Sequence, residues 1–161
     1  MTATLDVVYQ SASCSIATLG SVVLVLWRAN MDAEGARQQE QVLVRHARGR
    51  SVVGLLPYIE KGVKPPSAEV RTLLNATMNK LSPMLVGVAV TTEDDGFHAA
   101  IVRSVAIAVS NLSRTKAPSR SFGNVVEAAQ WLRERMGASV EGEPPVAAFA
   151  QAVEQLRRLR A

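Results

Sequence analysis

Ser67 has the position in this sequence that most suggests a chemical role. It follows an apolar run, Ser51–Ile59, and a loop, Glu60–Pro66, and it opens a segment with helical spacing of apolar residues. A phosphate on its hydroxyl would be stabilised by the free backbone N–H groups and the dipole of the helix N-terminus, and would change the local charge by about −2. The alternative is a plain N-cap, which contributes about 1 kcal/mol to stability. Both interpretations stay open, and Ser67 is the candidate phosphorylation site.

Charged side chains surround Ser67 in the sequence and are the candidates for contact with a protein partner. They are Glu60, Lys61, Lys64 and Arg71. Open α/β sheets place their binding sites outside the carboxyl ends of the strands. The loop after the predicted strand is therefore the expected contact surface.

The motifs of nucleotide and metal chemistry are absent from the sequence. It contains neither G-x-G-x-x-G nor G-x-x-x-x-G-K-[ST]. His46 and His98 are far apart and belong to no ligand pattern, and His46 is interpreted as a surface group favoured by a helix C-terminus. Glu93–Asp95 lacks the spaced ligands of a calcium loop and is interpreted as a solvated turn. Because no serine lies in G-x-S-x-G either, we predict a protein that is not an enzyme and has no cofactor or metal.

The charge pattern argues against nucleic acid as a partner. The formal net charge is +4, but the basic residues are interspersed with acidic ones, as in Arg133–Arg135. A nucleic-acid surface normally clusters cations on one face and adds aromatic side chains for stacking. The densest basic stretch, Arg157–Arg160, is interpreted as a solvated helix terminus.

Composition and segment lengths indicate a cytoplasmic location. The chain has 161 residues, of which 48% are hydrophobic, so it can bury a real core. One cysteine, Cys14, cannot form an internal disulfide and is compatible with a reducing compartment. The longest uncharged apolar stretch, Ile16–Trp27, is too short to span a bilayer, and the N-terminus does not have the pattern of a secretion signal. We expect no association with a membrane.

The order of the segments predicts the fold class. Two strand-like runs on either side of a Gly20-Ser21 turn predict a hairpin. Three later strand-like runs predict two buried strands and a short edge strand. These five strands are expected at Val7–Leu19, Val22–Trp27, Ser51–Ile59, Met84–Thr91 and Ser119–Phe122. The result is an α/β fold with a mixed, mostly parallel sheet of about five strands.

Helical spacing of apolar residues predicts about four helices and a C-terminal amphipathic helix. They are expected at 33–47, 70–81, 97–112, 124–136 and 146–156, with N-caps at Asp32, Ser67 and Asn124. We expect an α/β domain at 1–137, a linker at 138–145 and a C-terminal helix at 146–161. Because Phe97–Leu112 and the Val146–Leu156 seam offer more apolar surface than one small sheet needs, we predict a homodimer.

The order of strands and helices resembles the STAS superfamily, the fold of anti-sigma-factor antagonists, and in particular its STAS/SEC14-like bacterial proteins of unassigned role. The resemblance covers about Val7 to Gly137. It rests on Val22–Trp27 followed by Asp32, on Pro65–Arg71, on Gly96-Phe97 leading to Arg103–Val105, and on Phe122 followed by Glu127-Ala128 and Trp131-Leu132. In the antagonist family a serine at the start of the helix after the third strand is phosphorylated by a partner kinase. By position that residue would be Ser67, although Pro66 replaces the aspartate that precedes the family's serine.

The resemblance implies a STAS-like fold and a regulatory protein–protein interaction module, controlled by phosphorylation in bacterial signalling. Its partner would be a kinase, an anti-sigma factor or another regulator. Two alternatives remain: a module that binds a small molecule or a lipid, and a structural protein that assembles with itself.

Overall fold

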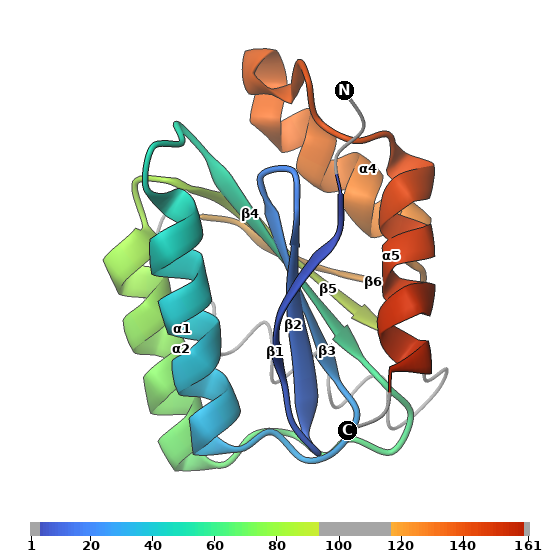
Figure 1. Ribbon diagram of the computed structural model, residues 1–161. Helices are drawn as coiled ribbons and strands as arrows, with labels where there is room; N and C mark the ends of the chain where they lie inside the picture. Colours follow the sequence, from blue (N-terminus) through green and yellow to red (C-terminus); the bar gives the residue numbers. More distant parts are fainter. Residues whose placement is uncertain (1–3, 94–116, 160–161) are drawn as a thin grey trace.

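The computed structural model describes residues 4–93 and 117–159, and they form a three-layer arrangement of helices, sheet and helices (Figure 1). The sheet has six strands, and their order across the sheet follows the chain. The strands are β1 (Asp6–Gln10), β2 (Cys14–Leu19), β3 (Val22–Trp27), β4 (Val53–Ile59), β5 (Leu85–Thr92) and β6 (Ser119–Phe122). The expected helix at 97–112 and His98 lie outside the described residues.

The sheet combines an antiparallel part with a parallel part. Strands β1, β2 and β3 pair antiparallel, and β3, β4, β5 and β6 pair parallel. The α/β class with a mixed, mostly parallel sheet is therefore confirmed. The hairpin is also confirmed, since β2 and β3 pair across the Gly20-Ser21 turn, from Leu19 opposite Val22 to Cys14 opposite Trp27.

The predicted first strand, Val7–Leu19, is two strands instead of one, which raises the strand number from about five to six. The chain turns between β1 and β2 because the Ser11 hydroxyl accepts hydrogen bonds from the backbone N–H groups of Ser13 and Cys14, at 3.2 and 3.1 Å. Serine hydroxyls that bond to nearby backbone groups compete with extended structure in this way.

Four α-helices cover the two faces of the sheet, within the described part of the chain. Helices α1 (Ala33–Ala47) and α2 (Ala68–Leu81) lie on one face, and α4 (Val125–Met136) and α5 (Val146–Arg158) lie on the other (Figure 1). A short 3-10 helix, η1 (Gly137–Val140), lies between α4 and α5. The predicted N-caps are confirmed: Asp32, Ser67 and Asn124 each accept a hydrogen bond from a backbone N–H of the helix that follows.

Strand β3 is the centre of the core and is buried on both faces. All of its residues are at most 1% exposed. Val23, Val25 and Trp27 pack in the cluster with α1 and α2, and Leu24 and Leu26 pack in the cluster with α4 and α5. This is the pattern of a parallel-sheet strand covered by helices on both sides.

Helix α5 contributes to the same core. Its inward side chains Phe149, Val153 and Leu156 are 1%, 2% and 0% exposed and belong to the cluster that includes Leu24 of β3. The apolar seam predicted at Val146–Leu156 is therefore used inside the protomer, where the half-buried Val146 packs against the same cluster. Among the described residues, none of the helices has the length and apolar character needed to cross a membrane.

Candidate functional site

The parallel strands bring charged residues together at the carboxyl edge of the sheet. Strands β3, β4 and β5 end at Trp27, Ile59 and Thr92. The charged residues Arg28, Glu60 and Glu93 each come directly after these ends. Because neighbouring parallel strands end at the same edge, side chains that are about thirty residues apart in the chain become neighbours there.

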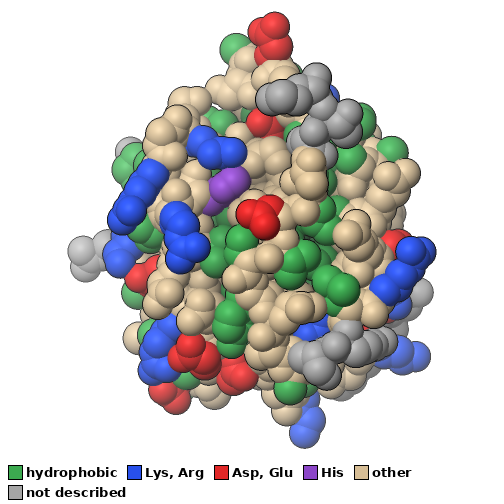
Figure 2. Space-filling view, viewed as in Figure 1, with side chains coloured by type: hydrophobic (Ala, Val, Ile, Leu, Met, Phe, Trp, Pro, Cys, Tyr) green, Lys and Arg blue, Asp and Glu red, His purple; other side chains and the backbone are tan. Residues whose placement is uncertain are grey.

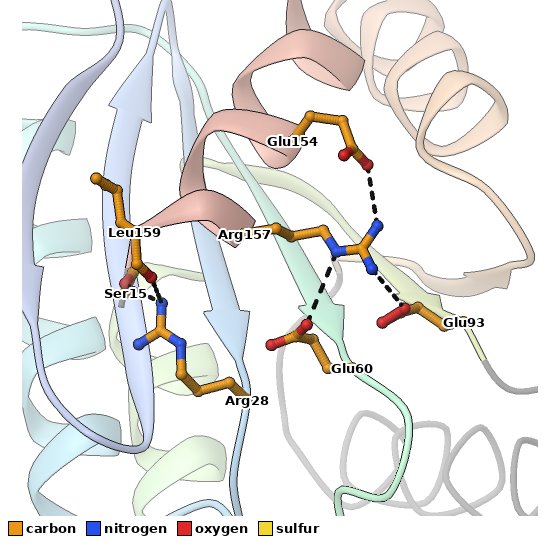
Figure 3. A network of polar contacts seen from close by, with 7 residues as sticks. All are labelled: Ser15, Arg28, Glu60, Glu93, Glu154, Arg157 and Leu159. Carbon is orange, nitrogen blue, oxygen red and sulfur yellow. Dashed lines mark hydrogen bonds and ion pairs between the residues drawn. The ribbon is translucent and has the colours of Figure 1, made fainter. Parts of the chain in front are cut away.

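Arg157 of α5 joins two of these strand ends through its guanidinium (Figure 3). Its nitrogens lie 3.1 Å from a Glu93 oxygen, 3.0 Å from a Glu154 oxygen and 3.7 Å from a Glu60 oxygen. The guanidinium carbon is also 5.8 Å from the centre of the Tyr58 ring. Burial, together with the Glu93 carboxylate, raises the pKa of Tyr58 to about 12, so its phenol stays neutral at physiological pH.

Arg28 fastens the end of α5 to the antiparallel part of the sheet. It donates to the Ser15 hydroxyl and to the backbone oxygen of Leu159 at 3.2 Å (Figure 3). It also donates to the backbone oxygen of Ser11 at 2.9 Å. Its Nε is buried without a hydrogen-bond partner. The two arginines therefore hold α5 against β2, β4 and β5 from one end.

The loop after β4 carries the exposed side chains of Lys61 and Lys64 on an anchored backbone. Val63 is 1% exposed and packs in the core, and the backbone N–H of Lys64 donates to the Asn30 side chain at 3.2 Å. Gly62 has φ +90°, a conformation that other residues rarely adopt, and it permits the turn before Val63. A backbone anchored in this way fixes the points from which the charged side chains extend.

Ser67 and three of the four predicted contact residues lie exposed on this loop and the start of α2. They are Lys61, Lys64 and Arg71. The Ser67 hydroxyl accepts from the backbone N–H of Val70 at 3.3 Å. Its exposure leaves it accessible to a kinase, and its capping bond accounts for its position equally well.

Glu60, the fourth predicted contact residue, has a different environment. Its side chain is 13% exposed and points to Arg157 (Figure 3). In this structure Glu60 therefore ties the start of the loop to α5, and the exposed surface of the loop is cationic.

Three interpretations made from the sequence are wrong in part, and Asp94, Asp95 and Arg160 lie outside the described residues. Glu93 is not in a purely solvated turn, and Arg157 is not a purely solvated helix end, because the two form an ion pair. His46 lies in the last turn of α1, as predicted, but it is half-buried instead of a surface group, with Nε2 2.7 Å from the Gly20 oxygen. Burial lowers the pKa of His46, and the bond to Gly20 acts in the opposite direction. Arg158, beside Arg157, is exposed as predicted.

The sequence contained only part of the pattern that predicts the arginine cluster, which consists of Arg157 with Glu60, Glu93 and Glu154. Glu60 and Glu93 each follow a buried strand, and Arg157 follows the buried Leu156 in the predicted seam. The position of α5 relative to those strands could not be obtained from the seam alone, since an apolar stripe does not specify what it packs against.

A second group of cations lies over the first two helices. Figure 2 shows Lys and Arg side chains gathered on the α1 side of the molecule. Arg45, Arg48 and Lys80 line an open hollow of about 360 Å³ there together with Glu40. Lys80 lies 2.7 Å from Glu40 and lowers the pKa of that carboxyl by a hydrogen bond. One cation of this group is therefore already paired.

Metal ligands do not gather in the described part of the chain. No group of three or more His, Cys, Asp or Glu side chains is arranged there to hold a metal ion. Comparison with known proteins identifies no relative, because no family model, curated protein or solved structure matches the chain. The chemical character of its surfaces is therefore the basis for any functional proposal.

Proposed function

We propose that this protein is a non-enzymatic regulatory module that binds a protein partner through the loop after β4 and the start of α2. The contact residues are Lys61, Lys64 and Arg71, and Ser67 lies between Lys64 and Arg71 in the chain. The observation that carries the proposal is the combination of an exposed, cationic set of side chains with a backbone anchored by Val63 and Asn30. Pre-organised loops lose less conformational entropy on binding than mobile ones.

The charge of the surface indicates an acidic partner surface. Complementary charges raise the rate of association and discriminate among partners. Phosphorylation of Ser67 would add a charge of about −1.5 to −2 among these cations, and would weaken attraction to an acidic partner. This is the phosphorylation-controlled function that the STAS resemblance implies, with a kinase as one partner and an anti-sigma factor or another regulator as the other.

Photo-crosslinking tests the location of the contact. A photoreactive amino acid placed at position 61 or 64 is expected to crosslink to a discrete partner in cells of the source organism. The same amino acid at Arg45 or Arg48, which are also exposed and cationic, is the matched control. A partner that crosslinks only at positions 45 and 48 would place the contact on α1 and contradict the proposal.

Ser67 is tested by substitution in the full chain. Ser67→Asp should weaken binding of the crosslinked partner and keep the helix cap, since aspartate is also a good N-cap. Ser67→Ala should cost about 1 kcal/mol of stability and leave binding intact. If both variants bind the partner as the wild type does, Ser67 acts only as an N-cap.

The homodimer is a separate proposal. Phe149, Val153 and Leu156 of the seam are buried within the protomer, so a dimer would have to use other surfaces. Sedimentation velocity over a range of micromolar concentrations is the check. A single monomeric species throughout would remove the dimer.

A further inference from the structure

A hollow of about 410 Å³ lies between the edge strand β6 and helix α4, away from the loop after β4. Its lining comes from Arg120, Phe122 and Gly123 on the strand side and from Glu127, Trp131 and Glu134 on the helix side. The proposed contact loop and the arginine cluster contribute no residue to this lining.

Two aromatic rings form the apolar wall of the hollow. The centres of the Phe122 and Trp131 rings are 5.7 Å apart, and the ring planes are inclined by 50°. Trp131 also lies directly over Gly87 of β5, where an added Cβ would come within 2.9 Å of the indole. The absence of a side chain at Gly87 therefore lets the indole lie close to the strand and fixes one of its sides.

Two carboxylates flank the indole on the side of α4 that lines the hollow. Glu127 is four residues before Trp131 and Glu134 is three residues after it, so all three lie on one face of the helix. Both glutamates are exposed. Within the described part of the chain neither forms an ion pair, whereas Glu40, Glu60, Glu93 and Glu154 each lie within ion-pair distance of a cation.

The third charged residue of the hollow, Arg120, is on the opposite side. Its guanidinium carbon lies 5.3 Å from the centre of the Phe122 ring. Its positive charge disfavours a cation next to β6 and directs one towards α4. The hollow thus contains two negative charges and one positive charge, in a chain whose formal net charge is +4.

We propose that this hollow binds a segment of a partner protein by receiving a lysine or arginine side chain between Glu127 and Glu134, against Trp131. An aromatic ring attracts a cation through its electron-rich face, and a carboxylate supplies a charge-assisted hydrogen bond. An aromatic ring flanked by two carboxylates without ion-pair partners combines both attractions. The surface is separate from the loop after β4, and its binding does not depend on the function proposed for that loop.

The proposal is tested by titrating the full chain with a short capped peptide of alternating lysine and valine, followed by amide and indole NMR signals. We expect saturable shifts centred on the indole N–H of Trp131 and the amide of Gly123. The same peptide with acetylated lysines has lost its charge and should bind at least about tenfold more weakly. No saturable shift of these signals up to about 10 mM peptide would overturn the proposal.

Charge variants distinguish binding of the peptide in the hollow from general electrostatic attraction to the protein surface. The double variant Glu127→Gln/Glu134→Gln should weaken binding at least about tenfold, and Arg120→Glu should strengthen it. The control Glu69→Gln/Glu141→Gln removes the same charge at exposed positions outside the hollow, where Glu69 lies 4.0 Å from Arg37, and should bind as the wild type does. Equal weakening in the two double variants would overturn the proposal.

Two further measurements test whether the bound cation belongs to a protein segment and whether the hollow binds independently of the loop after β4. Free lysine amide should bind far more weakly than the peptide, and equal affinity would overturn the assignment to a protein segment. Lys61→Glu/Lys64→Glu should leave peptide binding unchanged, so failure of the loop proposal and failure of this one give different results. Loss of peptide binding in that loop variant would contradict the separate site.

Discussion

Replacing Arg157 by methionine tests whether the arginine cluster holds α5 to the sheet. Methionine keeps an apolar stem near Tyr58 and removes the guanidinium. The contact with Glu154 joins the half-buried Arg157 to an exposed side chain three residues away and contributes a few tenths of a kcal/mol. Glu60 and Glu93 are 13% and 21% exposed, and a hydrogen bond to a charged group contributes about 1.5–3 kcal/mol. Because Arg157 itself is 34% exposed, solvent screening reduces that value.

We therefore expect Arg157→Met to lower the free energy of unfolding by about 2 kcal/mol, or the melting temperature by roughly 4–8 °C. Arg158→Met is the control, since Arg158 is exposed and its loss should cost under about 0.5 kcal/mol. Urea unfolding at low and high salt measures both, and the difference between the variants should shrink at high salt. Equal effects of the two substitutions would refute the reasoning.

A double-mutant cycle that combines Arg157→Met with Glu93→Gln measures the interaction energy between Arg157 and Glu93. The Arg157 nitrogen and the Glu93 oxygen are 3.1 Å apart, and groups in direct contact show interaction energies of about 0.5–3 kcal/mol. We expect an interaction energy of about 1 kcal/mol between the two side chains. Additive effects of the two substitutions would show that the ion pair contributes nothing to stability.

Two further predictions concern His46 and α5. Burial lowers the pKa of His46 in the folded protein, so the unfolded chain binds a proton more readily. The free energy of unfolding should therefore fall as the pH is lowered through about 6.5, the ordinary value for histidine, and level off below the folded pKa. His46→Gln should weaken this dependence, which urea unfolding across pH 4–8 would detect, and an unchanged pH profile would contradict the assignment. Phe149→Ala should cost about 3–5 kcal/mol because the ring is 1% exposed. The half-buried Val146→Ala should cost clearly less, and similar losses in thermal melts would show that α5 is not part of the core.

The local part of the fold could be predicted from the sequence because its causes are local. Asp32, Ser67 and Asn124 are N-cap residues directly before segments of helical spacing, and each caps the expected helix. The uninterrupted apolar run of β3 likewise indicated a strand buried on both faces. The turn at Ser11–Ser13 was missed, since its residues differ little in type from the strand residues beside them.

The arrangement of the charged side chains could not be predicted because it depends on which elements pack together. The contact of Arg157 with Glu60 and Glu93 joins residues that are 97 and 64 positions apart in the chain. The spacing of Glu127, Trp131 and Glu134 on one helix face was visible in the sequence. The hollow itself could not be predicted from this spacing, because it also depends on Phe122 and Gly87, which the sheet places beside Trp131.

Quantitative affinity purification with charge-reversed full-length protein tests the central proposal most directly. The variant Lys61→Glu/Lys64→Glu reverses two exposed charges on the anchored loop, and Arg45→Glu/Arg48→Glu makes the same change on α1. The free energy of unfolding of both variants should lie within about 1 kcal/mol of the wild-type value, because exposed side chains contribute little to stability. We expect a discrete partner to be retained by the wild type and the α1 variant and lost from the loop variant. Retention of the same partners by the loop variant would contradict the proposed contact surface.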